Sequence, residues 1–193
     1  MKQYLLVSVV VVMMSACSFK SAPIMQVYSL AEVEVKPVEA SRYRHSVLKV
    51  AFPQTRKEKL TNKMHYSYGL GEQGVYQNAR WSNHSGALLQ GMLLEVLSKS
   101  HLFKAVLPYT STANEDLRLE SSVIDFSHHI RGEASYSVVS IVFSLIDTHT
   151  GNLLKTKRFC YKENTQTTNA KGYVLATQRA MEKLSYDLIA WLR

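Results

Sequence analysis

Residues 137–147 read SVVSIVFSLID and form the most regular apolar stretch of the chain. Val139, Ile141, Phe143 and Leu145 alternate along it, which is the period of a β-strand. Apolar residues also occupy several of the intervening positions, so both faces of the strand have apolar side chains. The stretch therefore predicts a central strand of a sheet.

Two further strand-like runs flank it, at residues 117–126 and 153–162. The segment 147–152, with sequence DTHTGN, is short and polar and contains a glycine, which is typical of a tight turn between paired strands. The three runs together predict an antiparallel meander.

Two segments have the 3.6-residue period of amphipathic helices. The first, residues 85–99, places apolar residues three and four apart at Leu88, Leu89, Met92, Leu93, Val96 and Leu97. Residues 169–193 have a similar stripe at Tyr173, Ala176, Ala180, Leu184, Leu188 and Trp191. Ser82, Asn83 or Ser85 is the expected N-cap of the first helix.

Shorter strand-like runs occur at 25–30, 47–52 and 101–106, and two aromatic-rich runs at 65–69 and 75–81 indicate a loose hairpin. Each apolar helix stripe needs a partner, and one face of a sheet supplies it for both. We therefore expect an α+β fold: a two-layer sandwich in which two amphipathic helices cover one face of a largely antiparallel sheet of about six strands.

The N-terminus reads as a secretory signal, because Lys2 precedes the apolar run 4–14 and small residues follow it. Its last four residues, Met14-Ser15-Ala16-Cys17, resemble the lipobox of bacterial lipoproteins, in which the signal is cut before the cysteine, and the thiol and the new amine are acylated. We expect a signal peptide at 1–16, cleavage between Ala16 and Cys17, a lipidated tether at 17–24 and one domain at 25–193. An ordinary signal with a chance cysteine is the alternative.

Lipidation at Cys17 would hold the domain outside the cytoplasm on a membrane face, since several acyl chains such as palmitate give stable anchoring where one does not. Ser18 follows the cysteine where inner-membrane signals often have aspartate, so the sequence resembles signals sorted to the outer membrane. We expect an outer-membrane lipoprotein that faces the periplasm, with the inner membrane as the alternative.

The formal net charge is +8, and much of the excess lies between residues 36 and 63. The basic residues there are Lys36, Arg42, Arg44, Lys49, Arg56, Lys57, Lys59 and Lys63. This segment either contacts anionic lipid headgroups near the anchor or is a solvated loop, and the role of its part from Arg56 to Lys63 stays open. Nucleic acid is not an expected partner, because a secretory signal removes the protein from it.

Cys160 is the only cysteine besides Cys17, so no internal disulfide is expected once Cys17 is acylated. It lies in a strand-like run, where we expect it to be buried as a small apolar side chain. A lone thiol that pairs between chains or reacts in an oxidising compartment is the alternative.

No catalytic constellation is recognisable. The serine-nucleophile elbow, the zinc-protease helix motif and the phosphate-binding loop are absent, and Gly69–Gly74 matches a dinucleotide fingerprint without the strand and helix it needs. His128 and His129 are adjacent, so on a strand they point to opposite faces and, even with Asp125 nearby, make a poor metal site. We expect no enzyme activity, no metal and no cofactor.

Four aromatic residues, Tyr66, Tyr68, Tyr76 and Trp81, lie within sixteen positions and beside glycines. They either line an apolar ligand surface or a protein interface, or form the core beneath a hairpin.

The order of these features resembles the ABC-type transport auxiliary lipoprotein family, which includes PqiC-like proteins. The matching features are the lipobox, the opening Val27-Tyr28-Ser29-Leu30, the strand Val47 to Phe52 with Pro53, the tract from Tyr66-Ser67-Tyr68 to Trp81, the helix from Ser85 to Lys99, Ile124-Asp125-Phe126, Leu145-Ile146-Asp147 before Gly151, Phe159, and the ending Ala190-Trp191-Leu192. The basic segment 54–63 departs from the family, whose members commonly have a more apolar segment there.

The resemblance implies a periplasmic accessory lipoprotein that works with an ABC transporter and a mammalian-cell-entry (MCE) domain protein, in systems that move lipids or other hydrophobic molecules between membranes. Two alternatives stay open: an assembly or structural lipoprotein of an outer-membrane or secretion complex, and an envelope hydrolase. Homo-oligomers are compatible with an exposed strand edge.

Overall fold

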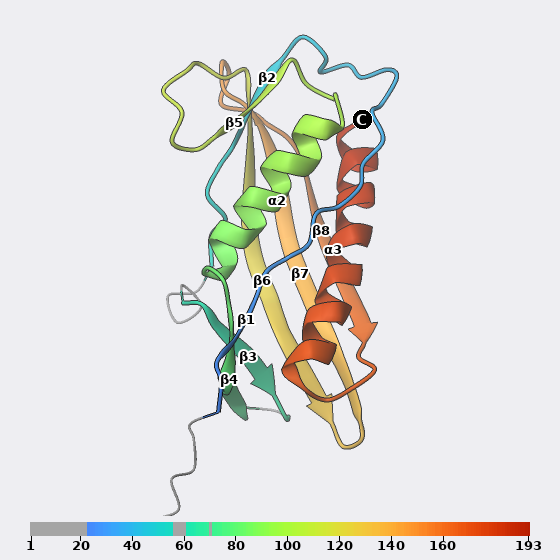
Figure 1. The fold of residues 1–193 in the computed structure, drawn as a ribbon. Helices are drawn as coiled ribbons and strands as arrows, with labels where there is room; N and C mark the ends of the chain where they lie inside the picture. The colour runs from blue at the N-terminus through green and yellow to red at the C-terminus, as the bar shows by residue number, and fades with distance from the viewer. Residues whose placement is uncertain (1–22, 56–60, 70) are drawn as a thin grey trace, which may run out of the picture.

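The computed structural model describes residues 23–55, 61–69 and 71–193. They form two layers, a sheet and a pair of helices packed on one of its faces (Figure 1). The predicted α+β two-layer sandwich is therefore confirmed. The signal peptide, Cys17 and residues 56–60 of the basic segment lie outside the described residues.

The three longest strands form the predicted meander. β6 (Leu117–Arg131), β7 (Ala134–Asp147) and β8 (Leu153–Asn164) pair antiparallel in sequence order, so β7 is central as expected. β6 and β7 continue beyond their predicted ends to a tight turn at Gly132, where a φ of 60° favours glycine because it has no Cβ.

The other five strands widen the sheet. β3 (Lys63–Ser67) and β4 (Gln73–Trp81) form the predicted hairpin, and β1 (Gln26–Tyr28) adds to β4 in parallel. β2 (Val47–Val50) lies parallel to both β6 and β5 (Ala105–Pro108). β2 and β3 share one edge of β6, at its N-terminal and C-terminal halves respectively. The sheet thus has eight strands and is mixed, whereas about six strands in a largely antiparallel order were expected.

Both predicted helices form with nearly the expected bounds. α2 (Ser85–Lys99) packs over β2 and β5, and α3 (Ala170–Leu192) packs over β7 and β8. Asn169 caps α3, because its side chain accepts a hydrogen bond from Gly172 N at 2.9 Å. The two helices run side by side on the same face of the sheet (Figure 1).

The N-cap of α2 is His84, and the prediction of Ser82, Asn83 or Ser85 is wrong. His84 Nδ1 accepts from Ala87 N at 3.2 Å and so occupies the capping position itself. The side chain of Asn83 instead accepts from the backbone of His84 at 2.9 Å.

Side chains from both layers meet in one continuous core. Trp81 lies in it with 1% of its surface exposed, its ring centroid 5.7 Å from Phe126 and 5.6 Å from Tyr173. Full burial of one large apolar side chain contributes about 1.5–3 kcal/mol, so this aromatic cluster is a major source of stability.

Candidate functional site

Residues 29–38, which we call the strap, lie on the helical side of the molecule between α2 and α3 (Figure 1). The chain enters beside the start of α2, where Ser82 N donates to Tyr28 O at 2.6 Å. It leaves beside the end of α2, where Val38 N donates to Ser100 O at 2.8 Å. The strap therefore runs the length of α2, which is about 22 Å at 1.5 Å per residue.

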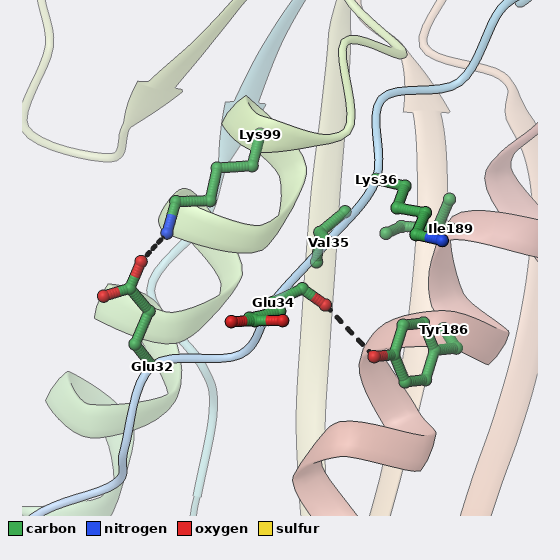
Figure 2. Close-up of a pocket in the computed structure, with 7 residues that line it drawn as sticks. All are labelled: Glu32, Glu34, Val35, Lys36, Lys99, Tyr186 and Ile189. Atoms are coloured by element: carbon green, nitrogen blue, oxygen red, sulfur yellow. Dashed lines mark hydrogen bonds and ion pairs between the residues drawn. The ribbon is translucent and has the colours of Figure 1, made fainter.

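Two side chains of α3 bind the strap through its backbone. The amide group of Gln178 accepts from Ala31 N at 2.9 Å and donates to Ala31 O at 3.3 Å. The hydroxyl of Tyr186 donates to Glu34 O at 3.1 Å (Figure 2). Val33, only 2% exposed, places its side chain in the core. The strap is thus part of the folded domain rather than a loose continuation of the tether.

An open groove of about 710 Å³ lies beside the strap (Figure 2). Its lining residues are Glu32, Glu34, Val35, Lys36, Lys99, Tyr186 and Ile189. The ammonium group of Lys99 pairs with Glu32 and, at 2.7 Å, with Glu95. The hydrogen bond between Lys99 and Glu32 raises the pKa of Lys99 and lowers that of Glu32. Both groups are therefore held in charged form, and they tie the strap to α2.

No sequence pattern marked Gln178 or Tyr186 as functional. Both lie off the apolar stripe of α3, and their partners in the strap are about 150 residues earlier in the chain. Only the periodicity of α3, which assigns them to its outer surface, hinted that they were available for such a contact.

A second groove, of about 660 Å³, lies where the described chain begins. It is lined by Pro23, Ile24, Gln26, Tyr28, Tyr76, Gln77, Asn78, Ala79, Asn169, Ala170 and Lys171. Ile24, Met25 and Val27 are exposed by 87%, 46% and 53%. The end of the molecule at which the described chain begins thus has an apolar surface. We call it the tether end, because the predicted tether precedes it in the sequence.

The structure separates the four predicted aromatic residues. Tyr66 lies 5.1 Å from Tyr68 and 5.3 Å from Tyr76, measured between ring centroids. Tyr68 is 54% exposed and Tyr76 lines the groove at the tether end, so these three remain available for a ligand or an interface. Trp81 has no such surface, because it is a core residue, and the hypothesis is withdrawn for this position.

His128 and His129 point to opposite faces of the sheet, as expected for neighbours on a strand. His128 is fully buried, stacked on Tyr173 at 5.3 Å, and its Nδ1 is 2.7 Å from the hydroxyl of Tyr76. Burial, and then the charge of His129, lower the pKa of His128 to about 4. Burial also raises the pKa of Tyr76 to about 12. Both side chains are therefore neutral near pH 7. His128 is a packed polar group of the core, whereas Tyr76 is half-buried and also reaches the groove at the tether end.

His129 lies on the helix-free face of the sheet with Asp125 and Ser127, at a small pocket of about 210 Å³. Its Nε2 is 2.9 Å from Asp125 Oδ2 and 3.2 Å from Ser127 Oγ. In a nucleophilic triad the carboxylate and the serine contact opposite nitrogens of the imidazole. Here both approach the same nitrogen, so this arrangement does not activate the serine.

No three histidine, cysteine, aspartate or glutamate side chains gather at a spacing that would hold a metal ion within residues 23–55, 61–69 and 71–193. Among the helices that the structure describes, none combines the length and apolarity needed to cross a membrane.

The basic residues Lys36, Arg42 and Arg44 do not lie near the tether end. Pro23, before the strap, lies beside the start of α3. Tyr43, after the strap, lies beside the end of α3, where Lys155 lies over the rings of Tyr43 and Trp191. The two ends of α3 are about 34 Å apart at 1.5 Å per residue. Contact of these residues with headgroups at the anchor, which assumed proximity in space, is therefore not supported.

Cys160 lies on β8 with its side chain exposed, so the expectation that it is buried is wrong. Among the described strands β8 pairs with β7 alone, so it is an edge strand. Its side chains on the face of the sheet without helices have no second layer to cover them.

Comparison with known proteins identifies the family to which the chain belongs. A family model described as "ABC-type transport auxiliary lipoprotein component" matches residues 28–189. A search of curated proteins finds no match.

Two solved structures share the fold. Protein XCC0632 from Xanthomonas campestris, of the family DUF330, has a TM-score of 0.77 and 18% identity over 86% of this chain and 94% of its own. An uncharacterised protein has a TM-score of 0.68 and 16% identity over 88% of this chain and 99% of its own.

Proposed function

This chain belongs to the ABC-type transport auxiliary lipoprotein family, and from that premise we propose that it is a membrane-anchored periplasmic accessory of an ABC/MCE-type transport system that moves lipids or other hydrophobic molecules across the cell envelope. The observation that carries the proposal is the family match, which runs from Tyr28, the last residue of β1, to Ile189 in the last turn of α3.

The anchor in this proposal is Cys17, acylated after cleavage behind Ala16, and the membrane is the outer one. The lipobox sequence and Ser18 support both assignments. Six peptide units separate Cys17 from Pro23, a reach of no more than about 21 Å when fully extended. The tether end, with its exposed Ile24, Met25 and Val27, therefore lies close to the membrane in this arrangement.

A docking role, rather than catalysis, fits the polar groups of the site. In the strap groove Lys99 is paired with Glu32 and Glu95, and His129, Asp125 and Ser127 do not form an activated nucleophile. The domain then acts by presenting surfaces to an MCE-domain protein and to transporter components. Tyr66, Tyr68 and Tyr76 are one such surface, on the side of the tether.

The test is mild cross-linking of the lipidated protein in its native envelope, followed by mass spectrometry of the proteins that co-purify. The variant Cys17→Ala, which cannot be acylated, is the control. An ATPase, a permease or an MCE-domain protein should be recovered with the native chain and lost with the variant. Separation of the two membranes by density should place the native chain in the outer one.

Recovery of only an outer-membrane channel or an assembly complex would replace this proposal with a structural role in that complex. The native mass of the cross-linked species would also report whether copies of the chain associate with each other.

A further inference from the structure

Three cationic side chains converge at the end of the molecule opposite the tether. Arg42 Cζ lies 4.9 Å from the ring centroid of Tyr43, and Lys155 Nζ lies 5.6 Å from the same centroid. Lys157 Nζ lies 4.8 Å from the centroid of Phe159. We call Arg42, Lys155 and Lys157 the distal cation cluster.

The aromatic rings beneath the cluster are fixed by packing. Tyr43 stacks on Phe103 with centroids 5.8 Å apart, and Phe159 meets Trp191 edge to face at 6.0 Å. Lys155 also lies 5.2 Å from the centroid of Trp191 and donates to Trp191 O at 2.6 Å. The cations are thus held over rigid rings by cation–π contacts, which restricts them to one region of the surface.

No ion pair within the described residues offsets the positive charge of this cluster. Within the described part of the chain, no carboxylate forms an ion pair with Arg42, Lys155 or Lys157. Glu163 on the same strand pairs instead with Lys183 at 2.6 Å and Arg179 at 3.7 Å.

Holding these cations close together has an electrostatic cost. Partial burial, and then the charge of Arg42, lower the pKa of Lys155. Like charges placed together repel each other, and an anion bound between them would relieve that repulsion.

The position of the cluster decides which anion it meets. The tether end faces the membrane if Cys17 is acylated, so this step rests on the proposed function. The cluster lies beside the end of α3, about 34 Å from the tether end along that helix. Under the proposed function it is therefore at the end of the domain away from the anchoring membrane. In that arrangement the cluster is turned away from the headgroups of the anchoring membrane, and we take an acidic protein segment as the anion that its three cations and neighbouring rings suit.

We propose that Arg42, Lys155 and Lys157, with the half-buried rings of Tyr43 and Trp191, form a docking site for an acidic segment of a partner protein. Carboxylates of that segment pair with the three cations, and the edges of the two rings supply apolar contact. Arg42 and Lys157 are exposed and reach the partner first, while Lys155, half-buried, lies deeper.

The test uses the full chain as Cys17→Ala, kept in solution by a mild non-ionic detergent because residues 4–14 are apolar, and a fluorescent peptide of six glutamates as the probe. Arg42→Gln with Lys157→Gln removes two charges and keeps Lys155, whose bond to Trp191 O supports the end of α3. The matched control is Arg80→Gln with Lys171→Gln, which removes two exposed charges at the other end.

Binding followed by fluorescence anisotropy should weaken about tenfold in the distal double variant and less than about twofold in the control, with both folded by circular dichroism. Added salt should weaken binding to the native sequence. Equal weakening in both double variants would overturn the site, because only net charge would then matter. Binding through Arg42 and Lys157 to phosphatidylglycerol vesicles but not to the peptide would also overturn it, in favour of lipid.

This assay is independent of the transport proposal. If cross-linking in the envelope recovers no transport protein while the peptide still depends on Arg42 and Lys157, the transport role fails and the docking site stands. If transport proteins are recovered and the peptide shows no such dependence, the docking site alone is overturned.

Discussion

Acidification from pH 8 to pH 5 should destabilise this protein chiefly through one side chain, the imidazole of His128. Its ring is fully buried between Tyr76 and Tyr173, and its Nε2 has no hydrogen-bond partner among the residues that the structure describes. A proton added to the ring would place a charge in the core and a donor without an acceptor. The pKa of His128 is therefore depressed to about 4, by burial first and then by the charge of His129.

The sign and size of the effect follow from proton linkage. The unfolded state, with a histidine pKa of about 6.5, binds the proton more readily than the native state, so stability is complete above pH 6.5 and falls as the pH approaches 4. At pH 5, proton binding to His128 in the unfolded state shifts the unfolding equilibrium about 30-fold toward that state. In the native state, with a pKa of about 4, the same histidine binds almost no proton at pH 5 and gives almost no stabilisation. The difference is about 2 kcal/mol lost between pH 8 and pH 5.

The measurement is urea unfolding at pH 8 and at pH 5, followed by circular dichroism. The variant His128→Gln keeps a neutral polar side chain and loses the titration, so the fall in its free energy of unfolding between the two pH values should be smaller by about 2 kcal/mol. His45→Gln, at an exposed position, should keep the native fall. If His128→Gln kept it as well, the buried imidazole would not be the source of the acid sensitivity.

Three further predictions address packing and exposure. Gly172→Ala should lower the free energy of unfolding by about 1–3 kcal/mol, because a Cβ at this position would overlap Thr167. Gly91→Ala, in the open middle of α2, should raise the free energy of unfolding by about 0.5–1 kcal/mol. Urea unfolding compares the two variants, and equal effects would contradict the reasoning. Val33→Ala should cost about 1–2 kcal/mol and speed hydrogen exchange of the strap amides, and unchanged exchange would mean that Val33 does not hold the strap. Cys160 should react with a thiol reagent in the native Cys17→Ala chain without denaturant, and protection until unfolding would show it to be covered.

The parts of the fold that the sequence predicted are those set by local patterns. In α2 and α3 the apolar stripe, and in β7 the alternation, repeat over many neighbouring residues. Several residues therefore indicate the same type of element, and no single one of them decides the prediction. The N-cap of α2 depends on a single side chain, and there the general preference for serine and asparagine gave the wrong residue. His84 caps the helix because Asn83 is already bonded to the backbone of His84 itself.

The parallel strand pairs could not be predicted, because they join segments far apart in the chain. β2 reaches β6 across about seventy residues and contributes only four residues of its own. Nothing in so short a run specifies which strand it will join. Trp81 illustrates the same limit at the candidate site: its position in an aromatic-rich hairpin gave no sign that it faces the core under α3 while Tyr68 does not.

A single β-bulge determines which histidine is buried. In the first half of β6 the odd positions face the core, from Leu117 to Val123, and uninterrupted alternation would have buried His129 with Asp125. The register shifts between Val123 and Asp125, and from there the even positions face inward. His128 is therefore buried, and His129 lies on the open face. The sequence correctly separated the two histidines but did not indicate which one joins the core.

The strap shows that distance along the chain does not measure distance in space from the predicted anchor. Arg42 follows Cys17 by only twenty-five positions, and that nearness made contact with headgroups reasonable. Ten residues held between two helices carry the chain to the opposite end instead, because Val33 is buried and Gln178 and Tyr186 bind the strap backbone. A cationic group that follows the predicted tether closely in sequence thereby lies at the opposite end of the domain, and under the proposed function that is the end where a periplasmic partner would dock.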